Sequence, residues 1–505
     1  MQGKGRESGS ARPSDAEVSA EPVIMGLREA YIEKFKADPE NDPVALEAID
    51  YHFRWVNETI RSVEGLRAKA EPLHREALLK FAARAYRRPL APPERDEILA
   101  FYRTLRDKSE LTHQEAIRDS IVRILMSPNF CYRIDLSDSG TAKGPGSAVL
   151  AKSAVPANPL SAYALASRLS YFLWSSMPDD TLMALAESGE LRKPQVLAAQ
   201  AHRMLKHERA RGLAVEFAGN WLEFRRFEDH NAVDRERFPV FDNDLRQAMF
   251  EEPVRFIEDV IRNDGSVLNL IYGNHTFVNP VLAKHYGIAD IQGGPGDWVR
   301  VENARRYGRG GMLPMSVFLT HNSPGLRTSP VKRGYWVVRR VLGEEIPPPP
   351  PSVPELPEDE SKIDLPLRDM LARHRDNPAC AGCHARFDSF GLAFENYGPV
   401  GERRAKDLAG RPVDTTAVFP DGTEAAGFEA VQEFIRRNRQ NDFLDNLSRK
   451  LLAYSLGRSL LLSDEPLIES MRTALAARDF RFAALVDTIV TSPQFMNRRS
   501  TGTER

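Results

Sequence analysis

Cys380, Cys383 and His384 form the pattern C-x-x-C-H, and this combination of residue types suits one particular chemistry. The pattern is the attachment signature of a c-type haem. Two thiols must add to the two vinyl groups along one edge of the porphyrin, so both sulfur atoms must lie on one side. Residues three apart in a helix share a face, and the next residue can then present its imidazole to the iron. The sequence therefore predicts one covalent haem, with Cys380 and Cys383 as attachment points and His384 as an axial ligand.

Two other interpretations of this pattern stay open. The thiols and the imidazole could form half of a zinc site, or the thiols could be chemically inert. Zinc is disfavoured because the chain has only three cysteines and the third, Cys131, lies far away in the sequence. A zinc site would need a distant fourth ligand.

The rest of a haem site is less clearly marked. A low-spin electron-transfer haem needs a sixth ligand, which is usually Met or His. Met315 and His321 are the first candidates, because they lie in a loop-like stretch that can fold over a haem face. Arg327, Lys332 and Arg333 are candidates for binding the haem propionates, since a guanidinium group binds a carboxylate with two parallel hydrogen bonds. The ordinary alternatives are core packing for the first two residues and a solvated helix start for the other three.

Composition excludes several classes of function. The chain has 505 residues, 42% of them hydrophobic, and a net charge of −2. No global field favours nucleic acid, and no apolar run is long enough for a membrane span. The sequence has no phosphate-binding loop, no dinucleotide fingerprint and no zinc-protease motif, so no catalytic residue is identified. A redox partner protein is the expected partner, and the sequence does not indicate an oligomeric state.

The N-terminal segment conflicts with the haem prediction. Residues 1–10 are polar and small, and they lack the apolar core of a signal peptide. Covalent haem attachment takes place outside the cytoplasm in bacteria, so the haem predicts a periplasmic or other extracytoplasmic location. A wrong start, a removed leader, non-classical export and a motif without haem all stay open as explanations.

The pattern of apolar residues predicts a mainly α fold with several helical subdomains, a haem-binding segment and a small β hairpin. Apolar residues recur at helical spacing over most of the chain. Residues 347–351 form a run of prolines, which predicts a stiff spacer. The hairpin is expected within residues 411–428, around Pro420, Asp421 and Gly422.

The end of the chain repeats part of its beginning. Ile124–Phe130 resembles Ile489–Phe495, and the two Ser-Pro pairs occupy the same place within these stretches. Further upstream, Tyr86 and Arg88 resemble Tyr454 and Arg458. We interpret the two stretches as copies of one helical unit. The alternative is that Ser-Pro simply ends a helix twice.

These motifs together resemble four families of unknown function that occur side by side in large multidomain proteins of planctomycete-type bacteria. The resemblance implies exported, cytochrome-like proteins whose activity is not established. It spans about residues 75–500. The stretches that carry it are Arg84–Leu90 for DUF (domain of unknown function) family 1595; Leu165–Asp180, Thr276–Asn279 and His285–Gly287 for family 1592; Arg309–Gly311, Arg327–Gly334, the proline run, Cys380–His384 and Glu395–Tyr397 for family 1588; and Leu447–Phe495 for family 1585.

Composition and the resemblance together give the expected domain boundaries. We expect a disordered N-terminus (1–22), a helical domain (23–136, resembling family 1595 from about 75), a linker (137–159), a second helical domain (160–290, family 1592), a haem-binding domain (291–428, family 1588) and a C-terminal helical domain (429–505, family 1585).

One position departs from the family pattern. Relatives usually carry Met three residues after the haem-site His, and this chain has Phe387 there. A residue at that position would lie on the proximal side of a haem, so the departure does not remove the haem prediction. Three functions are compatible with the sequence: one-electron transfer to or from a partner redox protein, a haem enzyme with an open distal site that acts on peroxide or another small oxidant, and a non-catalytic assembly scaffold stabilised by haem.

Overall fold

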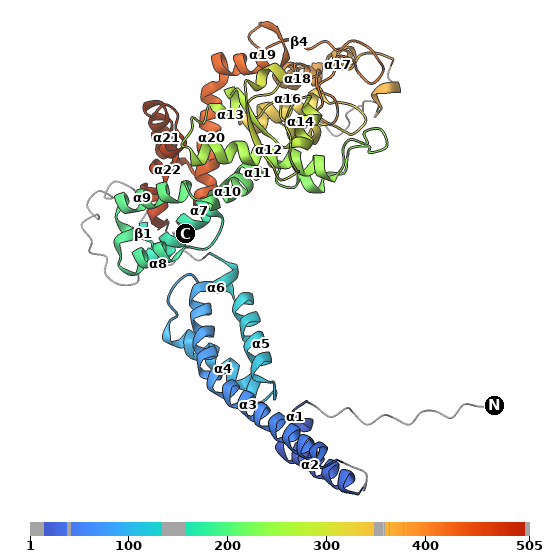
Figure 1. Ribbon diagram of the computed structural model, residues 1–505. Coiled ribbons are helices and arrows are strands. Elements are labelled where there is room, and N and C mark those ends of the chain that lie inside the picture. Colours follow the sequence, from blue (N-terminus) through green and yellow to red (C-terminus); the bar gives the residue numbers. More distant parts are fainter. Residues whose placement is uncertain are drawn as a thin grey trace, which may run out of the picture. The chain divides into compact units, whose positions relative to one another are not determined.

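The structure is mainly helical, with three small two-stranded antiparallel sheets among its described residues (Figure 1). It is a computed structural model that describes residues 15–37, 42–133, 157–347, 357, 359–362, 364–376 and 378–499. The predicted fold class is confirmed. The chain divides into two compact units, residues 1–132 and residues 133–505. No helix within the described ranges is long and apolar enough to cross a membrane.

Unit 1 is built around one long helix, α3. Asp42 caps this helix by accepting a 2.9 Å hydrogen bond from the Val44 amide, and Pro43 occupies its first position. The C-terminal part of α3 packs against two further helices, and Leu78, Ile98 and Ile124 are buried between them. The helices of unit 1 are α1 (Asp15–Val18), α2 (Glu21–Lys36), α3 (Pro43–Ala85), α4 (Pro92–Asp107), α5 (His113–Met126) and α6 (Pro128–Cys131).

The segment expected to be disordered, residues 1–22, contains α1 and the start of α2. Residues 1–14 lie outside the described residues. The same holds for most of the expected linker and for residues 348–351 of the proline run.

Unit 2 contains the remaining helices and all the strands that the structure describes. Its helices are α7 (Ala162–Trp174), α8 (Asp180–Glu187), α9 (Pro194–Leu205), α10 (Arg211–Leu213), α11 (Gly219–Trp221), α12 (Asn243–Arg262), α13 (Asn269–Tyr272), α14 (Pro280–Tyr286), α15 (Ser316–His321), α16 (Pro330–Trp336), α17 (Leu367–Arg375), α18 (Pro378–Leu392), α19 (Gly427–Phe434), α20 (Gln440–Leu456), α21 (Glu465–Ala477), α22 (Phe482–Val490) and α23 (Pro493–Met496). Its strands pair as β1 (Ala157–Pro159) with β6 (Asn497–Arg499), β2 (His275–Val278) with β3 (Val299–Glu302), and β4 (Thr416–Val418) with β5 (Glu424–Ala426).

The pair β4–β5 is the hairpin that the sequence predicted. Its turn contains Gly422 with a φ of 83°, a conformation that glycine adopts without strain. The Asp421 carboxylate accepts a 2.9 Å hydrogen bond from the Thr423 amide and closes the turn.

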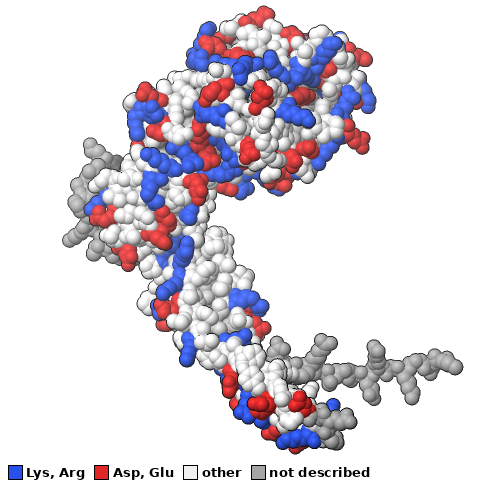
Figure 2. Space-filling model, in the orientation of Figure 1, with Lys and Arg blue, Asp and Glu red and all other residues white. Residues whose placement is uncertain are grey.

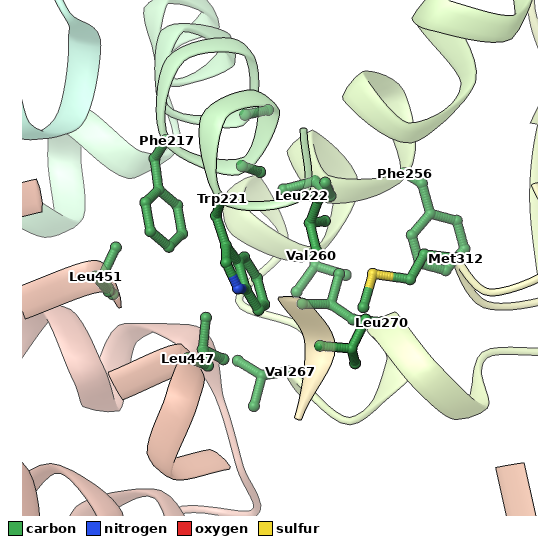
Figure 3. Packing of buried hydrophobic residues seen from close by; sticks show 14 of the residues in the cluster. Phe217, Trp221, Leu222, Phe256, Val260, Val267, Leu270, Met312, Leu447 and Leu451 are labelled. Atoms are coloured by element: carbon green, nitrogen blue, oxygen red, sulfur yellow. The ribbon is translucent and has the colours of Figure 1, made fainter. Parts of the chain in front are cut away.

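One continuous hydrophobic core runs through unit 2, from Leu160 to Phe495. Figure 3 shows part of it, where Trp221 lies beside Phe217 and close to Leu447. The rings of Phe217 and Trp221 stack with centroids 5.6 Å apart. Segments that are far apart in the sequence therefore share one interior. On the visible surface of this unit, acidic and basic side chains are mixed and neither sign dominates (Figure 2).

The structure supports the interpretation that the ends of the chain are copies of one unit. Ser127 and Ser492 each cap the short helix that follows, α6 and α23. In unit 1 the guanidinium of Arg87 donates to the carbonyls of residues 129, 130 and 132. In unit 2 the guanidinium of Arg168 donates to the corresponding carbonyls of residues 494, 495 and 497. The same turn is thus held by the same kind of contact in both copies.

A second shared contact lies upstream of each Ser-Pro turn. Arg88 binds Glu94 through two hydrogen bonds of 2.8 and 2.7 Å, and Arg458 binds Asp464 through two of 2.7 and 2.9 Å. Each carboxylate also accepts a backbone N–H three residues before it. The arginine that holds the Ser-Pro turn comes from a different place in each case, since Arg168 lies on α7, outside the second copy. The arginine–carboxylate pair six residues apart is made within each copy, and this contact favours duplication over coincidence.

Helices α16 and α18 cross so closely that only glycine fits at the crossing. A Cβ at Gly334 of α16 would collide with the Phe387 carbonyl, and a Cβ at Gly391 of α18 would collide with the Pro330 carbonyl. Both obstructing atoms belong to the backbone and cannot swing aside. The crossing therefore fixes α18, which carries the C-x-x-C-H pattern, against the core.

We expect Gly391→Ala to destabilise unit 2 by about 1–3 kcal/mol, because the added methyl group must push the two helix backbones apart. Gly382→Ala on the same helix is the matched control, since nothing lies within 4 Å of a Cβ there. The control should leave stability unchanged or raise it slightly through helix propensity. Urea unfolding of the full-length chain measures both. Equal stability of the two variants would contradict the close crossing.

Candidate functional site

The C-x-x-C-H pattern lies in the first two turns of α18. This helix begins at Pro378, which suits a first helical position because proline has no N–H to satisfy there. Cys380 and Cys383 are both half-buried and neither forms a disulfide. Cys383 packs against the core of unit 2. The i, i+3 spacing on a formed helix places the two thiols one turn apart, as covalent attachment to a porphyrin edge requires.

His384 is oriented by a carboxylate one turn further along the helix. Its Nδ1 lies 3.0 and 3.1 Å from the two carboxylate oxygens of Asp388, which is almost completely buried. A carboxylate can only accept, so Nδ1 donates and the lone pair of the neutral ring resides on Nε2. Metal-binding histidines in proteins are commonly held this way, since the carboxylate fixes the tautomer and raises the basicity of the metal-binding nitrogen.

Asp388 also has a charged neighbour. The Nε atom of Arg375, at the end of α17, lies 3.8 Å from the Asp388 carboxylate. Sequence reasoning did not single out Asp388. The signal that could have found it is its position four residues after His384, which places both side chains on one helix face.

Phe387, the residue that departs from the family pattern, packs beside the histidine. Its ring centroid lies 5.2 Å from that of His384 and 5.9 Å from that of Tyr335 on α16. The aromatic ring thus supports the imidazole from within the core. Its place on the proximal side of a haem stays a prediction.

Arg333 requires a correction. Its side chain is buried, and its guanidinium donates to the carbonyls of Tyr397 and Gly398 at 2.7 and 2.6 Å. It also donates to Phe394 O at 3.1 Å and to the Ser323 hydroxyl at 3.1 Å. Burial lowers the pKa of Arg333 to about 10. With its donors committed to the protein interior, Arg333 organises the backbone after α18 and is not placed to bind propionates.

The other two cationic candidates lie nearer the surface. Arg327 donates from Nε to the Pro357 carbonyl at 2.8 Å and from Nη1 to the Thr328 carbonyl at 3.0 Å. Lys332, on α16, is exposed. A role for either residue in binding propionates stays a prediction.

The two candidate distal ligands lie in different surroundings. Met315 precedes α15 and is 1% exposed within the core of unit 2. His321 ends α15, and its ring centroid lies 5.5 Å from that of His230. Burial lowers the pKa of His321, and it lowers that of His230 to about 4, so both rings favour the neutral form. Their assignment as distal ligands stays a prediction.

The two thiols and the imidazole on α18 can be compared with the ligands that a zinc site and a c-type haem need. Within the described ranges, no three His, Cys, Asp or Glu side chains are arranged around one point that a metal ion could occupy. A tetrahedral zinc site needs such convergence. A c-type haem does not, because the sulfurs bond to carbon atoms at the porphyrin edge while the imidazole bonds to the central iron. The two thiols and the imidazole on α18 match the groups that a c-type haem uses.

Comparison with family models gives four matches along the chain. Proteins of unknown function of families DUF1595, DUF1592, DUF1588 and DUF1585 match residues 74–135, 160–288, 309–407 and 421–495. The chain belongs to the proteins that combine these four families. They are the cytochrome-associated domains of planctomycete type. Curated proteins and solved structures gave no match.

A buried polar network joins the DUF1592 region to the DUF1588 region. Glu252 on α12 accepts hydrogen bonds of 2.5 Å from the hydroxyls of Thr276 and Tyr286. The Tyr286 oxygen also accepts the Ser316 amide at 3.0 Å. Arg309 lies over the Tyr286 ring, 3.6 Å from its centroid, and donates to a DUF1588 carbonyl, that of residue 401, at 2.7 Å. Thr276, Tyr286 and Arg309, which belong to the family motifs, therefore make buried contacts that hold the two regions together.

A second buried cluster anchors the segment that follows the proline run. Arg404 binds the Glu360 carboxylate at 2.7 Å and the Glu395 carboxylate at 3.1 Å. The Thr328 hydroxyl donates to Glu395 at 2.8 Å. Desolvation raises the pKa of Glu395. Because each buried charge has an opposite partner, the cluster ties residues 359–362 to the turn beyond α18.

We expect the buried Glu252 to make stability depend on pH. Burial raises its pKa from 4.5 to about 7, so the folded state holds this proton more tightly than the unfolded chain does. The resulting stabilisation, about 3 kcal/mol, is complete below pH 4.5 and is lost as pH rises towards 7.

Glu252→Gln should remove this part of the pH dependence, while Glu228→Gln, at an exposed glutamate, should keep it. Urea unfolding of both variants between pH 4.5 and 8 measures the difference. An identical slope in the two variants would contradict a protonated Glu252.

Proposed function

We propose that this chain carries one covalent c-type haem on Cys380 and Cys383 with His384 as an axial ligand, and that it transfers single electrons to or from a partner redox protein. The observation that supports this most is the hydrogen bond between His384 and the buried Asp388. A buried carboxylate in this place would hold a haem-ligating ring in one orientation and one tautomer.

The arrangement of the thiols supports the same proposal. Cys380 and Cys383 are half-buried, so one edge of an attached group would reach the protein surface while the other faces the core. An edge near the surface suits electron exchange with a docked protein. When bound, the haem supplies an iron that changes its charge by one. The polypeptide supplies the two cysteine anchors, the histidine ligand and the carboxylate that adjusts the donor strength of this histidine. The cytochrome-associated character of the four families favours this role.

The proposal also implies a cellular location. Thioether attachment of haem takes place outside the cytoplasm in bacteria, so a haem-loaded chain belongs in the periplasm or another extracytoplasmic space. No catalytic residue is assigned, and the chain would act as the electron-transfer component of an oxidoreductase system.

A haem enzyme with an open distal position is the second candidate. The deep burial of Met315 favours it, because a methionine held in the core is not free to reach an iron without repacking. In that case the iron would keep one position for peroxide or a similar small oxidant.

Visible spectra of the haem-loaded protein separate the two candidates. For electron transfer we expect six-coordinate low-spin bands in both oxidation states, which carbon monoxide does not change, because both axial positions are occupied. His321→Ala and Met315→Ala identify the sixth ligand, since loss of the true ligand should convert the spectrum to a carbon monoxide-binding form. A high-spin wild-type spectrum that shifts with carbon monoxide would instead support the enzyme.

We expect Asp388→Asn to raise the reduction potential. The carboxylate makes His384 a stronger donor, which favours the ferric state, and an amide removes this bias. Each tenfold shift of the ferric–ferrous equilibrium towards the ferrous form raises the one-electron reduction potential by about 60 mV. Asp369→Asn on the neighbouring helix α17 is exposed and serves as the control. An unchanged potential in a fully loaded Asp388→Asn protein would argue against His384 as the ligand.

A further inference from the structure

Helix α3 has two opposed apolar faces, and only one of them is covered by α2. The covered face contains Phe53, whose ring lies 5.6 Å from that of Tyr31 on α2. On the same face, the Asn57 amide donates to Glu21 of α2 at 3.1 Å. Trp55 is two residues from Phe53 and points to the opposite side, since each helical residue turns by about 100°. It is more than half exposed.

The uncovered face is a continuous stripe along thirty residues of helix. Val44, Tyr51, Trp55, Leu66 and Leu73 are all more than half exposed. Together with Ser62 they recur at alternating steps of seven and four residues, which is an eleven-residue repeat. This repeat keeps its residues on one side of a nearly straight helix, because it corresponds to about 3.67 residues per turn. The whole stripe lies before residue 74, where the matched family segment begins.

The stripe is complementary to itself in one antiparallel register. In that register residue 44 faces residue 73, residue 51 faces residue 66, and residue 55 faces residue 62. The bulky Trp55 then lies over the small Ser62, which suits interdigitated packing. On the flank of the same pair of helices, Glu47 of one copy comes beside Lys69 of the other. A parallel pair would instead place Trp55 against Trp55 and Ser62 against Ser62.

The exposed apolar area of the stripe is large enough for a small specific interface between two copies. Taking about 200 Å² for each full side chain, the five apolar residues present roughly 600 Å² per copy. Two copies would bury on the order of 1,200 Å², which is the lower limit for specific protein interfaces. The largest apolar patch of a typical monomer is no greater than about 600 Å² and often serves binding.

We propose that α3 pairs with α3 of a second copy of this chain, antiparallel, through the stripe formed by residues 44, 51, 55, 62, 66 and 73. The two α2–α3 hairpins then form a four-helix arrangement in which both apolar faces of α3 are covered. The interface is symmetric and its two-fold axis passes between residues 58 and 59. This association is independent of haem.

Analytical ultracentrifugation of the full-length chain over a range of micromolar concentrations tests the pairing. We expect a monomer–dimer equilibrium that Trp55→Glu weakens at least about tenfold. Val63→Glu is the matched control, because Val63 is an exposed apolar residue of the same helix that lies off the stripe. Glu58→Gln should tighten the dimer, since the two Glu58 carboxylates approach each other at the axis.

Cysteine cross-linking in a Cys131→Ser background tests the register. Thr59→Cys lies beside the axis and should form a disulfide dimer, whereas Ser62→Cys should not, because it faces Trp55 of the other copy. This second measurement does not depend on whether Trp55→Glu folds. A wild-type chain that stays monomeric, a Trp55→Glu variant that still dimerises, or cross-linking through Ser62→Cys would each overturn the proposal. A monomer would mean that another part of the chain or a different protein covers the stripe.

Discussion

The close crossing of α16 and α18 holds the C-x-x-C-H turn in place. Two glycines allow backbone to touch backbone, and a larger residue at either position would separate the helices. Next to the crossing, the guanidinium of the buried Arg333 donates hydrogen bonds to backbone carbonyls of the segment that follows α18. Steric contact thus sets the position of α18, and hydrogen bonds set the path of the chain beyond it. Both are needed to fix the positions of His384 and Asp388 on α18.

Within unit 2, the regions matched by families DUF1592, DUF1588 and DUF1585 pack around a shared interior. The hydrophobic core of unit 2 is continuous, and the Glu252–Tyr286–Arg309 network crosses from the DUF1592 region to the DUF1588 region through buried groups. Removing one member of such a network would leave its partners unsatisfied in a low-dielectric interior, at a cost of several kcal/mol. The DUF1588 region cut out alone would expose polar groups that now have partners.

Sequence reasoning succeeded where the signal is local. The helices, the hairpin around Gly422 and the capped Ser-Pro turns follow from short-range patterns, and the structure shows them. It failed where the partner is distant. Arg333 looked like a surface cation at a helix start, but it is buried and three of its partners are carbonyls more than sixty residues away, which nothing in the spacing reveals. Asp388 was overlooked although its i, i+4 relation to His384 is visible in the sequence, because an acid at this spacing on a helix is common and does not by itself mark a site.

The most direct test of the haem is the intact mass of the full-length chain after co-expression with haem-maturation machinery. The account predicts a coloured protein heavier than the polypeptide by one haem, a mass that survives denaturation because the bonds are covalent. The Cys380→Ala/Cys383→Ala double variant should lack the added mass, and Cys131→Ala should keep it. A colourless wild-type chain with the mass of the bare polypeptide, made in cells that load a control cytochrome, would contradict the account.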